Sequence, residues 1–234
     1  MKPISMLFPP AAAWIAFGGL HHASGATPLP PWYGTPGSTH QGYLFGNGSL
    51  TPTPDILDNP YGTPAATVVT GPFSDNWQDP DATYDLAGVN DDGAWDLGKT
   101  GTITIVLPFT QFAASPGVTY RVDFEVYTVA YLGISALPLF TSPGQTPGAL
   151  TLSQNTVATD PLFPGATWQG LNWTGYFENL TSNTITFAIK APANNTSVVD
   201  SIEVFTHVTI IPEPSAFLLV ILPAAAWIGR RRRG

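Results

Sequence analysis

The sequence predicts an all-β fold, an antiparallel β-sandwich of the jelly-roll kind, over residues 41–211. Apolar and polar side chains alternate in several short stretches, which is the pattern of strands with one buried and one solvated face. The 23 glycines and 24 prolines supply frequent turns, and such residues disfavour long helices. No part of this region shows sustained helical periodicity, and an apolar fraction of 44% is enough to fill a core.

The alternation indicates eight strands. It is clear in residues 102–107, 118–126, 184–190 and 198–208, and weaker in residues 41–46, 65–70, 148–158 and 168–178. In the best example, Tyr120, Val122 and Phe124 alternate with Arg121 and Asp123. Strands of this length, separated by turns rich in Pro, Gly, Asn and Asp, are typical of two packed antiparallel sheets.

Residues 1–26 have the composition of a signal peptide. Lys2 precedes an apolar run, and small residues lead to an expected cleavage after Ala26. A buried helix and a membrane anchor are the alternatives, but Pro9 and Pro10 disfavour the first and the short run disfavours the second. We therefore expect signal peptidase to act on the chain, and residues 27–40 to form a Pro/Gly-rich lead-in to the domain.

The last segment, residues 212–234, has three parts. The tripeptide Pro212, Glu213 and Pro214 is followed by an uncharged apolar helix over 215–229 and by the cluster Arg230, Arg231, Arg232 and Arg233. The arginines are expected to stay on the cytoplasmic side of a membrane. Fifteen helical residues span about 22 Å, less than the roughly 30 Å of a hydrocarbon core, so the segment favours temporary retention over a permanent anchor.

This arrangement resembles the C-terminal signal of the PEP-CTERM family of exported proteins from exopolysaccharide-producing Gram-negative bacteria. The resemblance implies that an exosortase-type transpeptidase recognises Pro212, Glu213 and Pro214 and cleaves nearby, and that Arg230 to Arg233 act as the stop signal. It covers residues 211–234 and the signal peptide, and it does not extend to the ectodomain. The chain is then expected in the cell envelope, on the outer surface or secreted, after transient attachment to the inner membrane. An ordinary single-pass anchor is the alternative.

Charge and cysteine content exclude several functions. Between residues 41 and 211 three Lys and Arg stand against fifteen Asp and Glu, a net charge of −12. Such a surface repels nucleic acid, so nucleic acid is excluded as a partner. The chain has no cysteine, so disulfides and thiolate chemistry are absent.

An acidic segment follows the second weak strand. Its candidate metal ligands are Asp75, Asp79, Asp81, Asp91, Asp92 and Asp96, with Asp200 as a further candidate on the last strand. Crowded oxygen ligands on loops are what Ca²⁺ takes, although the spacing does not match an EF-hand. The sequence leaves two interpretations open, a calcium site and a solvated acidic loop.

Aromatic residues form a second group of candidates. Trp77 and Trp95 lie in the acidic segment, where indole rings beside carboxylates are typical of sugar-binding sites. The alternative is core packing, because Trp is usually largely buried.

The sequence indicates export more clearly than it indicates a function for the ectodomain. After signal removal only His40 and His207 remain as histidines, and no Gly-x-Ser-x-Gly motif is present. We expect a non-enzymatic envelope or matrix protein working within exopolysaccharide. The alternative is a calcium-dependent carbohydrate-binding module acting on exopolysaccharide, and a hydrolase with two carboxylates is a minority hypothesis.

Overall fold

The computed structural model describes residues 29–78, 93–109, 119–133, 135–160, 163–180 and 182–211. The expected signal peptide and the sorting tail, residues 1–26 and 212–234, lie outside this part of the chain. The described residues include no helix with the length and apolar character that crossing a membrane requires.

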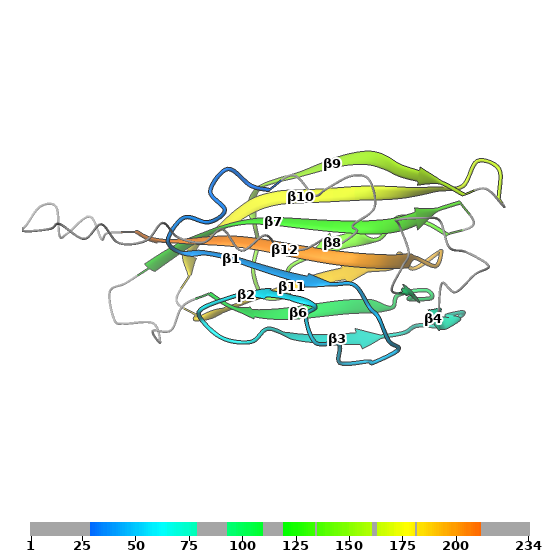
Figure 1. Ribbon diagram of the computed structural model, residues 1–234, viewed down its shortest axis with the longest axis horizontal. Helices are drawn as coiled ribbons and strands as arrows, with labels where there is room; N and C mark the ends of the chain where they lie inside the picture. Colours follow the sequence, from blue (N-terminus) through cyan, green and yellow to red (C-terminus); the bar gives the residue numbers. More distant parts are fainter. Residues whose placement is uncertain are drawn as a thin grey trace, which may run out of the picture.

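The protein is a β-sandwich of two antiparallel sheets packed face to face (Figure 1). Sheet A has the order β2 (Ile56–Asp58), β1 (Ser38–Tyr43), β12 (Val198–Ile211), β7 (Thr119–Leu132), β10 (Thr167–Leu180) and β9 (Gly148–Thr159), and β5 (Ala94–Asp96) joins it beside β12 and carries β4 (Asn76–Gln78). Sheet B has the order β3 (Ala65–Val69), β6 (Thr102–Pro108), β11 (Thr184–Lys190) and β8 (Leu139–Thr141). The prediction of an antiparallel sandwich is therefore confirmed.

All eight strands predicted from the alternation are present, with bounds shifted by a few residues. The prediction missed β2, β4, β5 and β8, which have three residues each. Three residues show one and a half periods of alternation, which is too little to recognise in a sequence.

The core lies between the sheets and is built from the inward halves of these alternating patterns. On β7, Tyr120, Val122, Phe124 and Val126 are buried. The ring of Phe124 lies 5.0 Å from that of Phe177, 5.2 Å from Phe187 and 5.6 Å from Phe140, as distances between ring centroids. These partners belong to β10, β11 and β8, so one ring links both sheets.

β12 occupies the middle of sheet A, between β1 and β7 (Figure 1). Its register with β7 continues to Ile211, which faces Thr119. The strand thus runs three residues beyond the predicted end and reaches the residue directly before Pro212. A register shift between Val199 and Ser201 marks a bulge near its start.

The lead-in packs against sheet A. The Trp32 ring stacks on His207 at 5.7 Å between ring centroids, and Tyr33 lies edge-on to His40 and Phe205, each at 5.7 Å. β1 begins at Ser38, so the last three residues of the predicted lead-in are already strand.

Candidate functional site

The structure describes the acidic segment, residues 75–96, only at its two ends, residues 75–78 and 93–96. The carboxylate of Asp96, on β5, is 8% exposed and accepts two backbone hydrogen bonds. The N–H of Asp75 donates to Oδ2 at 3.0 Å and the N–H of Gly98 donates to Oδ1 at 2.9 Å. These bonds fix the chain before β4 to the turn after β5. Asp96 therefore has a structural role as a turn cap, with both oxygens engaged.

The candidate ligands other than Asp75 and Asp96 lie outside the described residues or on β12. Asp79, Asp81, Asp91 and Asp92 fall within residues 79–92, outside the described residues. Asp200 lies at the bulge of β12 and is 8% exposed. The pKa of Tyr127 is raised by burial and then by the negative charges of Glu203 and Asp200. The described ranges contain no group of three or more His, Asp or Glu able to hold a metal ion, and calcium binding stays a prediction.

Both tryptophans proposed for sugar binding are packed. Trp95 is 2% exposed and belongs to the core. Trp77 is half-buried, and its Nε1–H donates to the carbonyl of Phe45 at 2.8 Å. Gly93, with φ of +130°, lies so close that a Cβ there would come within 2.5 Å of Trp77 Nε1. For Trp95 the structure supports the alternative interpretation, core packing.

The outer face of sheet A carries a polar row that sequence analysis did not single out. We use this name for Arg121, Asp123 and Glu125 of β7 together with Asn172 and Tyr176 of β10. The register places Tyr176 opposite Asp123 and Asn172 opposite Tyr127, on the side away from sheet B. The signal in the sequence was the solvated half of the alternation in 118–126.

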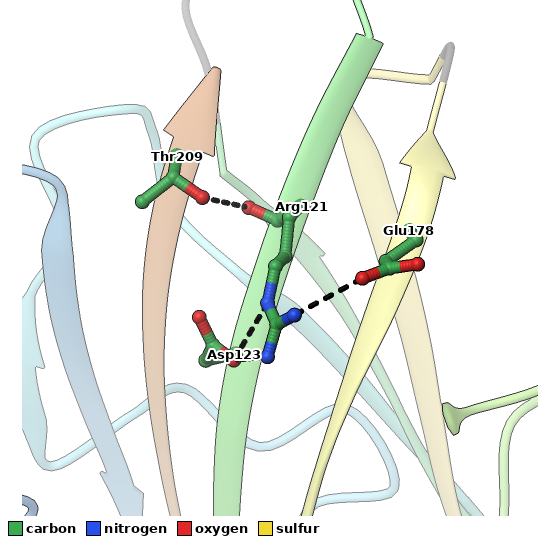
Figure 2. Close-up of polar contacts among 4 residues, drawn as sticks. All are labelled: Arg121, Asp123, Glu178 and Thr209. Atoms are coloured by element: carbon green, nitrogen blue, oxygen red, sulfur yellow. Dashed lines mark hydrogen bonds and ion pairs between the residues drawn. The ribbon is translucent and has the colours of Figure 1, made fainter. Parts of the chain in front are cut away.

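Arg121 organises one end of this row (Figure 2). Its Nη2 donates to Asp123 Oδ1 at 2.8 Å and its Nη1 to Glu178 Oε1 at 3.0 Å. The guanidinium carbon lies 4.0 Å from the centroid of the Tyr176 ring. The Thr209 hydroxyl donates to the Arg121 carbonyl at 3.4 Å, so three neighbouring strands contribute to the cluster.

These ion pairs position side chains more than they stabilise the fold. The side chains of Arg121, Asp123 and Glu178 are 37%, 28% and 43% exposed. Exposed pairs of this kind contribute about 0–1 kcal/mol, because water screens the charges. The arrangement holds the guanidinium against the Tyr176 ring, which Gly148 of β9 approaches closely. The ring is therefore committed to intramolecular contacts.

Glu125 is a half-buried acid of the row. The Nδ2–H of Asn172 donates to Glu125 Oε1 at 2.7 Å. Burial raises the pKa of Glu125, and the hydrogen bond from Asn172 partly offsets this effect. The Oδ1 of Asn172 is buried and has no hydrogen-bond partner among the described residues.

We expect Glu125→Gln to raise the free energy of unfolding at pH 7. Between the ordinary pKa of Glu and the raised pKa of Glu125, the folded state keeps a proton that the unfolded state releases, so stability falls as pH rises through this window. The neutral amide avoids that cost and still accepts the bond from Asn172. Urea unfolding at pH 7 and at about pH 3.5 measures the effect, and the gain should vanish at the lower pH, where Glu125 is protonated in both states.

The matched control is Glu178→Gln, which removes an exposed acid from the same face. The amide oxygen can still accept the bond from Arg121, but the variant loses the ionic attraction and gains no relief of burial, so it is not expected to stabilise. An equal gain in both variants, or a gain at both pH values, would contradict burial as the cause.

A histidine–carboxylate pair lies beside the lead-in. His40 Nε2 and Glu203 Oε2 are 2.9 Å apart, and both residues are 8% exposed. The imidazole stacks on Phe205 at 4.1 Å and meets the edge of Tyr33. The pair comes together because β1 and β12 are neighbours, and its aromatic surroundings indicate that it fastens the lead-in to sheet A.

No protein-family model matches the chain, and neither a curated protein nor a solved structure is significantly similar to it.

Proposed function

We propose that this chain is an exported, non-enzymatic β-sandwich of the cell envelope or extracellular matrix, delivered by an exosortase-type sorting tail. The observation that carries the proposal is the continuity of β12 with the tripeptide. Ile211 still pairs with Thr119 in sheet A, and Pro212 is the next residue. Cleavage near Pro212, Glu213 and Pro214 would release the sandwich without cutting a strand.

Packing of the candidate groups supports a structural role over a catalytic or sugar-binding one. Trp95 fills the core, the Asp96 carboxylate caps a turn, and Arg121 and Gly148 contact the Tyr176 ring. A lectin-like site needs an aromatic face open to the ligand, and catalysis needs acids free to exchange protons. Each of these side chains is engaged within the fold.

We also propose a jelly-roll topology for the ectodomain. The first and last strands of the described residues, β1 and β12, are neighbours in sheet A. The chain then crosses repeatedly between the sheets, for example from β10 to β11 and back to β12. Both features are expected when two Greek-key motifs wrap around one core.

The sorting step is tested with the full chain expressed in a bacterium that has an exosortase. We expect signal peptidase to remove residues 1–26 and the protein to leave the membrane fraction with a mass that lacks the tail. Replacing both Pro212 and Pro214 by Ala should leave the tail attached, because the extended peptide is lost. Fractionation and intact-mass spectrometry measure both outcomes.

The control replaces Pro143, an exposed turn proline between β8 and β9, by Ala. This variant should be released like the wild type. Release of the double variant, or release in a strain without exosortase, would overturn the sorting proposal.

The released protein also distinguishes the matrix role from the carbohydrate-binding alternative. It is incubated with purified exopolysaccharide of the host, first with calcium and then with a chelator. Saturable binding that the chelator abolishes would favour a calcium-dependent carbohydrate-binding module and direct attention to residues 75–96. Without binding in either condition, the structural role stands, and partners are sought among proteins.

A further inference from the structure

Strand β9 is a long open edge of the sandwich (Figure 1). It has 12 residues, Gly148–Thr159, and pairs with β10 along one side. In the described part of the chain, none of the other strands lies along its second side. The other strands at sheet edges are short, because β2 and β8 have three residues and β3 has five.

This edge lacks the usual protection against pairing. Soluble proteins place charged residues or prolines on edge strands, or shorten them, so that their free N–H and C=O groups do not join another chain. The segment Gly148–Thr159 contains no charged residue and no proline. In a chain of net charge −8, β9 is thus a segment that places no like charges at a contact between two copies.

The middle of β9 is regular enough to accept a second strand. Its register with β10 is unbroken from Thr151 to Thr156, and irregularities lie on both sides of that stretch. Six residues give about 20 Å of straight edge. Ser153 is exposed on the outer face, and Leu152 is 53% exposed on the face toward sheet B. Leu152 lies opposite Trp173 in the register, and the Trp173 ring in turn stacks on Phe140 of β8.

The side chains of this stretch are self-complementary. Consider two identical strands that pair antiparallel around a two-fold axis near Ser153. Ser153 then faces Ser153 of the other copy, and Thr151 faces Asn155. Hydroxyl and amide side chains of Thr151, Ser153 and Asn155 then line the outer face, where they can hydrogen-bond across the seam. On the opposite face this register sets Leu152 against Gln154 of the other copy. The two exposed Leu152 side chains are then diagonal neighbours, and each loses part of its contact with water.

We propose that β9 pairs with β9 of a second copy of this chain, joining two sheets A into one continuous antiparallel sheet. The contact is isologous, so it closes after two copies and does not extend into a fibre. The inference is independent of the sorting tail and of the sorting proposal, because it rests on β9 alone.

The test uses the full chain in mild detergent, with association measured by sedimentation velocity over a range of concentrations. We expect a dimer for the wild type. Ser153→Lys should weaken dimerisation by up to about fivefold, because it places like charges at the seam. Ser153→Glu alone should do the same, and an equimolar mixture of the two variants should restore the dimer, because unlike charges then meet.

The matched control is Thr67→Lys, which adds the same charge at an exposed hydroxyl residue in the middle of β3, an edge strand of sheet B. Its dimer should equal that of the wild type. Association through the tail would not respond to the charge at residue 153. A monomeric wild type, a dimer unaffected by Ser153→Lys, or a mixture that fails to recover would each overturn the proposal, and a monomer would direct the search for a β9 partner to extended segments of other proteins.

Discussion

A chain that stops after Ser197 is expected to remain unfolded, whereas one that stops after Ile211 is expected to fold. The difference is β12, which pairs with β1 on one side and with β7 on the other. Val199, Ile202 and Val204 of this strand are fully buried. Burying each such side chain contributes about 1.5–3 kcal/mol, and their combined loss approaches the whole stability of a domain, about 5–15 kcal/mol.

Far-UV circular dichroism and thermal unfolding of residues 27–197 and 27–211 measure this difference. The longer chain should show one cooperative transition and the shorter chain none. A third chain that lacks both residues 27–37 and the tail is the control, because it also removes an end that contacts β12 but keeps every strand. A cooperative transition in residues 27–197 would show that sheet A forms without its central strand.

Phe124→Ala is expected to lower the free energy of unfolding by about 3–5 kcal/mol. The ring is 2% exposed and contacts Phe140, Phe177 and Phe187. These neighbours belong to three strands, so the protein cannot easily collapse around the vacated volume, and most of the cavity should persist. Urea unfolding, fitted to a two-state transition, measures the change.

Val69→Ala serves as the control for this substitution, because it also removes apolar atoms from a strand of the sandwich. Val69 is 60% exposed on β3, and exposed substitutions usually change stability by less than about 0.5 kcal/mol. A loss below about 1 kcal/mol for Phe124→Ala would mean that the two sheets do not depend on this aromatic cluster.

The sequence predicted the long strands because alternation directly reports which face is buried. The same rule explains where the prediction stopped too early. In β7 the alternation is clear to Val126, but Tyr127, Thr128 and Val129 are all buried. With both faces covered, the pattern of period two disappears, and the six further residues of the strand could not be recognised.

The candidate site was predicted less well because its contacts join distant parts of the chain. His40 and Glu203 are 163 residues apart, and Arg121 and Glu178 are 57 residues apart. Only the order and register of strands bring them together, and neither follows from local composition. Trp95 shows the converse, because it lies in an acidic segment of the sequence but packs within the apolar core.

The place of β12 also sets when the protein can acquire its shape during synthesis. The ribosome makes this strand after all the other described strands, yet three strands of sheet A, β1, β5 and β7, pair with it. Until residue 211 is available, β1 has no partner on that side and β7 has one open edge, so sheet A cannot close over its side of the core. In the exported protein that we propose, closure of the sheet therefore comes at the same point in synthesis as the appearance of the sorting tail, which directly follows Ile211.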